Sequence, residues 1–152
     1  MSEHPAEHPE RAFIRRVIAE GGAGVPVPTN PLAQALSMTV EHAAPGRVRA
    51  AFRADRRFTQ GNGVIQGGIL SAMLDFGMAF AAFSVAEAGV TVATVSQTTS
   101  FFRPAPPGGF TVEAEVEKAG RTVIHTRAVI YDGTGQAVAA ATAPLAVVPM
   151  RV

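Results

Sequence analysis

The 152-residue sequence contains no cysteine, and its basic residues are 12 arginines with a single lysine, Lys118. Without cysteine the chain can form no disulfide, no thiolate nucleophile and no zinc–cysteine site. Its four histidines are not paired at metal-ligand spacing, so we expect neither a metal nor another cofactor. The start of the chain lacks the charged and then apolar pattern of a secretory signal, and we expect a cytoplasmic protein.

Charge is also scarce, at 16% of residues against 47% apolar residues, which is typical of one globular domain with a large core. A net charge of +1 is too balanced for a nucleic-acid binder, which usually carries a clustered basic face. Five arginines do gather between residues 47 and 57. A solvated strand edge explains them better than a phosphate-contacting patch does.

The periodicity predicts a helix over residues 9–20, ended by Gly21 and Gly22, and then a Gly- and Pro-rich loop through Pro31. From there the period is two. We expect a hairpin of strands at 36–42 and 47–53 around Ala44-Pro45-Gly46, and later strands at 90–102, 110–118, 121–131 and 136–148. Pro144 should mark an edge or a bulge in the last strand. We divide the chain into an N-terminal extension, residues 1–31, and a single domain, residues 32–152.

Residues 69–85 (ILSAMLDFGMAFAAFSV) are apolar on nearly every side of a helix, which fits a protein core or a membrane span. Asp75 near the middle argues against a span, because an acid there costs roughly 2.5–3.5 kcal/mol on insertion scales. An antiparallel sheet joined by tight turns also needs a cover for its apolar face. We therefore predict an α+β fold, an antiparallel sheet wrapped around one long central helix, with an extra N-terminal helix and no membrane contact.

Asp75 in this helix indicates a functional site, because burying a carboxylate without a partner costs free energy of folding. The alternatives are a carboxylate satisfied by backbone or an arginine, or one that faces a solvent gap. Small residues share its face, namely Gly68, Ser71, Ala72 and Ala79, and would leave room for a substrate or a second chain.

Gly67 and Gly68 open the helix with unpaired N–H groups at its positive end, where a developing oxyanion would be stabilised. Gly67 and Asp75 lie eight residues apart, which is roughly 12 Å of helical rise. They are too far apart to act on one carbonyl carbon. If both are catalytic, the N–H comes from one subunit and the carboxylate from another, which predicts an obligate dimer.

The segment from Gln60 to Asp75 (QGNGVIQGGILSAMLD) resembles the signature of the hotdog-fold acyl-CoA thioesterases, in the PaaI-like and 4-hydroxybenzoyl-CoA thioesterase group. That pattern has an amide residue, His-Gly-Gly six residues on, and an acid nine residues after the histidine. Residues 100–105 (SFFRPA) are similar to the strand-end motif of the family, and residues 120–122 and 131–135 to its later hairpin. The resemblance covers roughly residues 32–148.

The resemblance implies a hotdog fold, a homodimer often doubled to a homotetramer, and hydrolysis of an acyl- or aryl-CoA thioester. The Gly67 N–H and the Gln60 amide would polarise the thioester carbonyl. Asp75 of the facing subunit would act as nucleophile or as general base for water. Thr94 matches a hydroxyl that orients water in some relatives.

The same resemblance suggests residues that bind substrate. Candidates for the coenzyme A phosphates are Arg103, Arg121 and Thr122, with ordinary surface charges as the alternative. Further substrate-binding candidates in the loop and at the helix start are Asn62, Gln66 and Gly68. We expect the acyl pocket to be lined by Phe76, Met78 and Phe80 together with the facing chain.

One position departs from the family pattern, because Gln66 stands where the family has a histidine. An amide can donate a hydrogen bond but cannot titrate near neutrality. This departure keeps open a second hypothesis, a hotdog module that binds acyl-CoA without cleaving it. A hydratase of the same fold would need a histidine at the site, and His125 would have to reach it from a distant strand.

Overall fold

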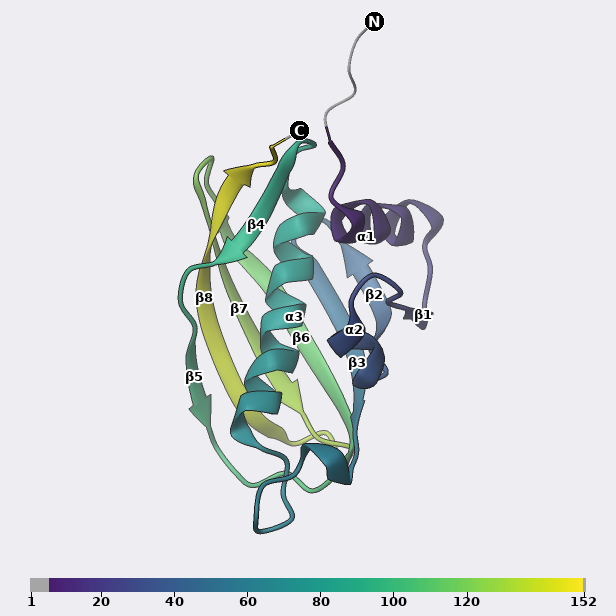
Figure 1. The fold of residues 1–152 in the computed structure, drawn as a ribbon, viewed down its shortest axis with the longest axis vertical. Coiled ribbons are helices and arrows are strands. Elements are labelled where there is room, and N and C mark those ends of the chain that lie inside the picture. The colour runs from purple at the N-terminus through teal and green to yellow at the C-terminus, as the bar shows by residue number, and fades with distance from the viewer. Residues whose placement is uncertain (1–5, 152) are drawn as a thin grey trace, which may run out of the picture.

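The computed structural model describes residues 6–151 and has one curved antiparallel sheet wrapped around a long helix, α3 (Gly67–Val85) (Figure 1). The other helices are α1 (Pro9–Glu20), α2 (Pro31–Ala35) and the 3₁₀ turn η1 (Arg56–Phe58). The strands are β1 (Val25–Pro26), β2 (Thr39–Ala44), β3 (Arg47–Ala54), β4 (Val90–Thr94), β5 (Thr98–Phe101), β6 (Gly108–Ala119), β7 (Val123–Tyr131) and β8 (Ala137–Pro149).

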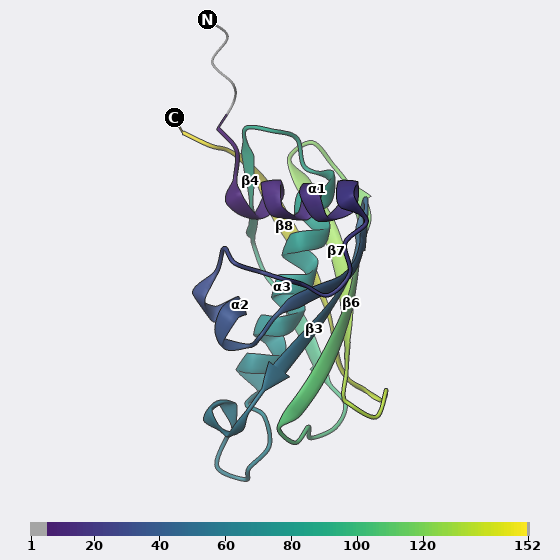
Figure 2. The same ribbon diagram turned by 90° about the vertical axis from the view of Figure 1, so that its right-hand side faces the viewer.

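The strands form one sheet in the order β1-β2-β3-β6-β7-β8-β4, and β5 also pairs with β8. Side chains alternate along them, so that on β3 Val48, Ala50 and Phe52 are buried whereas Arg47 and Arg49 are exposed. The helices lie on one side of the sheet and leave its other side uncovered (Figure 2). The predicted α+β fold, a sheet curled around one helix with an extra N-terminal helix, is confirmed.

Helix α1 has the predicted bounds and closes one end of α3. Gly21 ends it in the left-handed conformation, with φ 61°. The last turn of α3 has no basic residue of its own. Instead Arg11 donates from Nε to the carbonyl of Ala86 at 2.8 Å, and Arg15 donates from Nη1 to that of Ser84 at 3.3 Å. These guanidinium groups satisfy free carbonyls at the negative end of α3. The apolar side chains of α1 also belong to the same buried core as those of the sheet and α3.

Helix α2 was not predicted. Asn30 caps it by accepting hydrogen bonds at Oδ1 from the N–H groups of Leu32 and Ala33, and Pro31 occupies its first turn. An Asn-Pro pair is the usual start of a helix, but five residues are too few to show a helical period. The next strand consequently begins at Thr39, three residues later than residue 36, where we expected it.

The strand predicted at residues 90–102 is divided into β4 and β5. β4 ends with Thr94 opposite Leu145 of β8, and β5 begins with Thr98 opposite Thr142. Residues 95–97 therefore face only residues 143 and 144, so the outer strand holds one extra residue, as in a β-bulge. The N–H of Val95 donates to the carbonyl of Pro144 at 2.9 Å. Because the nitrogen and the carbonyl of one strand residue face the same neighbouring strand, the ring nitrogen of Pro144 also faces residues 95–97, and it has no hydrogen to donate to them. The last strand was expected to have an edge or a bulge at Pro144. Instead β8 is paired on both sides there, and the extra residue lies opposite Pro144 in the outer strand.

Gly77 sets how closely α3 lies on the sheet. A Cβ atom added there would come within 2.6 Å of Val112 Cγ1 and 3.2 Å of Ala114 Cβ, both on β6. Because Val112 is completely buried, it has little room to move away. Glycine at this position therefore permits a helix-to-sheet contact that any side chain would push apart.

We predict that Gly77→Ala lowers the free energy of unfolding by about 1–3 kcal/mol through overpacking, although alanine favours the helix intrinsically. Gly68→Ala is the matched control, since nothing lies within 4 Å of its added methyl group. Denaturant unfolding of both variants checks this. A Gly77→Ala protein as stable as the control would contradict the close contact.

Candidate active site

Asp75 lies on a face of α3 that residues 6–151 leave uncovered. The face is marked by residues that are not buried and recur every three or four positions, namely Gly68, Ser71, Ala72, Asp75 and Ala79. Asp75 is half-buried there, and Thr94 at the end of β4 donates a hydrogen bond from Oγ1 to its Oδ1 at 2.7 Å. The structure thus brings together two of the predicted site residues, which stand 19 positions apart in the sequence.

Asp75 faces an open side of α3, which fits the alternative of a carboxylate at a solvent gap and the room that its small neighbours were expected to leave. One expectation about the helix is wrong. Met78 and Phe80 are fully buried against the rest of the chain and cannot line an open acyl pocket. Phe76 is half-buried, with its ring 6.2 Å from that of Phe52, and remains a candidate. A helix that is apolar all round does not reveal which of its faces the sheet covers.

The loop before α3 is held by its backbone. Gln66 donates its N–H to the carbonyl of Phe58 at 2.9 Å, and Ile65 donates to that of Ala105 at 2.8 Å. The side chain of Gln60 turns into the loop, where its Oε1 accepts from the N–H of Asn62 at 2.6 Å. Among residues 6–151 its Nε2 has no acceptor, so the amide keeps a donor to offer. The side chains of Gln66 and Asn62 are exposed.

The helix start presents two free N–H groups. Within the described part of the chain no acceptor takes the N–H of Gly67 or of Gly68, and Gln66 makes no side-chain cap. A pocket of about 410 Å³ lies beside them, and Gln60, Gly67, Leu70 and residues 101–105 belong to its lining. The ring of Phe101 lies 3.4 Å from where a Cβ of Gly67 would stand. Because Gly67 has no side chain, this aromatic ring can pack closely against the start of the helix.

Asp75 does not line this pocket. The helix rises about 1.5 Å per residue, so the free N–H of Gly67 and the carboxylate of Asp75 are separated by roughly 12 Å along the axis. Within one chain the candidate residues therefore form two separate groups along α3, which are two half-sites if both are catalytic. One consists of Gln60 and Gly67, and the other consists of Asp75 and Thr94.

The candidates for phosphate binding lie at opposite ends of the molecule. Arg103 lines the pocket beside Gly67 and donates from Nη1 to Gln136 Oε1. Arg121 and Thr122 are exposed in the β6–β7 turn, at the end of the sheet remote from the start of α3 (Figure 1). One chain does not bring these two residues to the Gly67 pocket.

Sequence reasoning missed Gln97. Its Nε2 donates to the carbonyl of Ser71 at 3.1 Å and to Thr99 Oγ1 at 3.0 Å, which links the bulge between β4 and β5 to α3. Gln97 lies in the stretch predicted to be a continuous strand, where a period of two gave no reason for it to face the helix. Phe101, in contrast, belongs to the strand-end motif that the sequence did single out.

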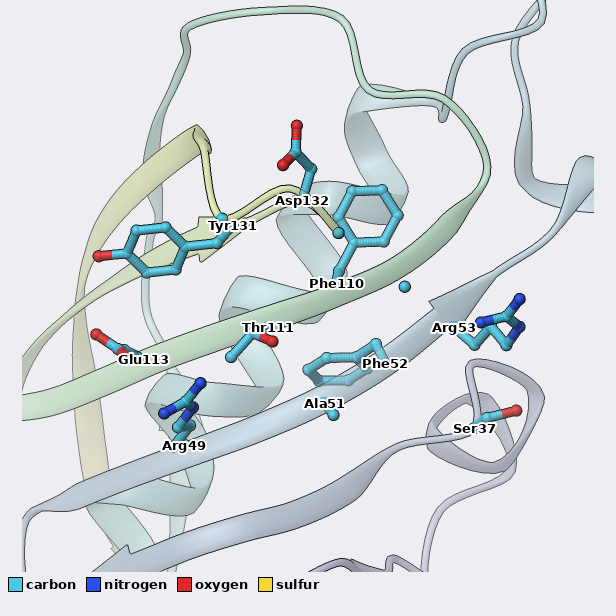
Figure 3. A pocket seen from close by; sticks show the side chains of 13 residues that line it. Ser37, Arg49, Ala51, Phe52, Arg53, Phe110, Thr111, Glu113, Tyr131 and Asp132 are labelled. Atoms are coloured by element: carbon cyan, nitrogen blue, oxygen red, sulfur yellow. The ribbon is translucent and has the colours of Figure 1, made fainter.

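A larger pocket, about 860 Å³, lies on the outer face of the sheet, where Arg49, Glu113 and Tyr131 come from three neighbouring strands (Figure 3). None of the predicted catalytic residues lines it. In the arginine cluster nearby, Arg47 pairs with Glu115 at 3.5 Å and Arg57 with Asp55 at 3.0 Å. These exposed ion pairs fit a solvated surface, but not the expected strand edge, because β3 is paired on both sides and Arg57 lies in η1.

The β7–β8 turn carries Asp132, which lines the larger pocket. Hydrogen bonds from Thr134, chiefly from its hydroxyl, and from the N–H of Gln136 hold the pKa of Asp132 below its ordinary 3.8, and the charge of Arg103 adds to this. Asp132 is therefore ionised at neutral pH. Across residues 6–151, no three histidine, aspartate or glutamate side chains lie close enough together to hold a metal ion.

Comparisons with known proteins identify the family and the fold. The family model described as the thioesterase superfamily matches residues 62–139, a range that includes Gly67, Asp75 and Thr94. A search of curated proteins found no match.

Solved structures similar to the chain include a thioesterase family protein from Silicibacter pomeroyi, at 31% identity and a TM-score of 0.77, with 93% of this chain and 99% of that chain covered. A phenylacetic acid degradation-related protein from Ralstonia eutropha JMP134 is 29% identical, with a TM-score of 0.77 over 88% of this chain and 98% of that one. The PaaI protein of the E. coli phenylacetic acid degradation operon shares the fold at 18% identity, with a TM-score of 0.74 and coverages of 93% and 94%. The predicted hotdog fold is confirmed.

We predict that Thr134→Val raises the pKa of Asp132 towards its ordinary value, because the largest cause of its lowering is lost. A carboxylate with a lowered pKa stabilises the fold above its unfolded pKa, and this stabilisation is lost as the pH falls through the lowered value. NMR titration of the Asp132 carboxyl carbon checks this, with Thr142→Val as the control. An identical titration in the Thr134→Val protein would contradict it.

Proposed function

Because the chain belongs to the thioesterase superfamily and is a thioester hydrolase, we propose that it cleaves an acyl- or aryl-CoA thioester to the free acid and CoA. The observation that carries this proposal is the half-buried Asp75 carboxylate on the open face of α3, oriented by the Thr94 hydroxyl. Among residues 6–151 no arginine or lysine pairs with Asp75, so its charge is not consumed by a structural ion pair.

Asp75 can serve in either of two ways. As a nucleophile, its carboxylate oxygen attacks the thioester carbon, the C–S bond breaks, the thiolate takes a proton, and water hydrolyses the resulting anhydride. As a general base, it takes a proton from water, whose oxygen attacks the same carbon, and the proton passes to the departing sulfur. Both routes need a carboxylate that is oriented and open to substrate, as Asp75 is on α3.

The Gly67 half-site supplies the complementary chemistry. In both routes negative charge develops on the carbonyl oxygen, and the free N–H of Gly67 at the positive end of α3 stabilises it. The Nε2 of Gln60 is a second donor, since its Oε1 is already engaged by Asn62. Gln66 lies beside them and shapes the loop without adding a group that titrates near neutrality.

Two chains are needed to complete each site. The separation of Gly67 from Asp75 requires that each carboxylate act on a carbonyl polarised by its partner. Three large apolar side chains along the bulge and β5 support this association, because Val95, Phe101 and Phe102 are 66%, 52% and 57% exposed in the single chain. We assign them to the contact of a homodimer, which can double to a tetramer.

Coenzyme A would then lie across the same contact. Arg103, at the pocket beside Gly67, is suited to a phosphate of the substrate bound there. If the two α3 helices run antiparallel, Arg121 and Thr122 of one chain approach the Gly67 end of the other. This arrangement would give residues that are remote within one chain a place in a shared site.

We predict that the purified protein releases free thiol from members of a panel of acyl- and aryl-CoA thioesters. Asp75→Asn should lower kcat by about 10²–10⁴, because the substituted amide can act neither as a nucleophile nor as a base. The matched control is Glu41→Gln, a charge-removing change at an exposed residue of β2. Tight binding without turnover by the wild type, or an undiminished Asp75→Asn enzyme, would overturn the proposed function.

A further inference from the structure

The bulge between β4 and β5 turns two side chains toward the same helix. In a regular strand, residues three positions apart point to opposite faces, so Thr94 and Gln97 could not both face α3. The extra residue opposite Pro144 shifts the alternation by one. As a result Thr94 reaches Asp75 at 2.7 Å and Gln97 reaches Ser71 at 3.1 Å.

The two contacts meet on a single turn of α3. In an α-helix each N–H bonds to the carbonyl four residues earlier, so the Ser71 carbonyl is also the acceptor for the N–H of Asp75. Gln97 thus donates to the same Ser71 carbonyl that accepts the backbone N–H of Asp75. Gln97 is half-buried, whereas Thr94, Val95 and Ser96 before it are exposed.

A second hydrogen bond fixes the Gln97 amide itself. Its Nε2 also donates to Thr99 Oγ1 at 3.0 Å, on the strand that follows the bulge. The amide therefore bridges β5 and α3, while the N–H of Val95 holds the bulge to β8 through Pro144. Without the Gln97 bridge, only one of the hydrogen bonds of residues 6–151, the one from Thr94 to Asp75, would still join this part of the bulge to the helix.

We propose that Gln97 is a positioning residue for Asp75, holding the bulge against α3 so that the Thr94 hydroxyl stays directed at the carboxylate. This inference rests on the proposed function of Asp75 in thioester hydrolysis. Gln97 does not contact the reacting atoms in this role, and it acts on them through Thr94. Its loss should therefore reduce kcat and leave KM nearly unchanged.

A double-mutant cycle tests whether Gln97 acts through Thr94. Gln97→Leu and Thr94→Val should each lower kcat by about tenfold, with KM within about twofold of the wild type. If Gln97 acts through Thr94, the double variant should be no slower than Thr94→Val alone. Losses that multiply in the double variant, or an effect confined to KM, would overturn the inference.

Two further variants separate this role from general damage. Gln97→Glu keeps the length of the side chain but removes the Nε2 donor, and it should reproduce the loss of kcat. Gln34→Leu removes a similar amide-to-carbonyl bond, to Pro28 at 3.1 Å, away from the site, and kcat should not change. A fully active Gln97→Glu enzyme would overturn the inference.

Amide hydrogen exchange provides a readout that does not depend on activity. The N–H of Val95 should exchange faster in Gln97→Leu than in the wild type, because the bulge is no longer tied to α3. Unchanged exchange would overturn the inference even if no thioester proved to be a substrate. Failure of the proposed function would instead appear in the wild type, or as an active Asp75→Asn enzyme.

Discussion

Helix α3 packs one side against the sheet, and at Gly77 the contact is too close for a side chain to fit. This contact determines which residues of an almost uniformly apolar helix become core. Leu74 and Met78 turn inward, and Asp75, although it lies between them in sequence, faces outward. The Asp75 carboxylate therefore lies on the helix face that residues 6–151 leave open, and α1 keeps the far end of the helix in place through Arg11 and Arg15.

The rise of the same helix is the basis of the proposed dimer. Its free N–H groups lie at its start and its carboxylate lies two turns later, so one helix holds two parts that cannot meet on one carbonyl carbon. A symmetric pair of chains resolves this, since a two-fold axis that completes one site completes the other as well. The exposed Phe101 and Phe102, next to the Gly67 pocket, lie where such a contact would cover them.

Much of the fold could be predicted from the sequence because the relevant signals are local. Helical spacing gave α1, and alternation gave the hairpin of β2 and β3 and the later strands of the sheet. The orientation of α3 could not be predicted, because a helix that is apolar all round carries no mark of the face that the sheet covers. That uncertainty is why Met78 and Phe80 were wrongly assigned to the acyl pocket.

The candidate site shows the same limit. The spacing of Gln60, Gly67 and Asp75 was visible in the sequence. Thr94 was named only through the family resemblance, as a hydroxyl that orients water, and its hydrogen bond to Asp75 was not predicted. Gln97 was not, because its contact with α3 depends on a bulge opposite Pro144, 47 positions further along the chain. Pairing between distant strands decides where that side chain points, and no local pattern reports it.

The shared site can be tested by mixing two inactive enzymes. Asp75→Asn removes the carboxylate, and Gly67→Pro removes the backbone N–H at a first-turn position where proline is tolerated. Gln66 already has the extended conformation that a following proline requires, with ψ 134°, and Gly67→Ala is the control that keeps the N–H. If each site takes its N–H from one chain and its carboxylate from another, random mixing by co-expression should restore roughly a quarter of wild-type activity. No recovery above the two parent variants would show that each site is built within one chain.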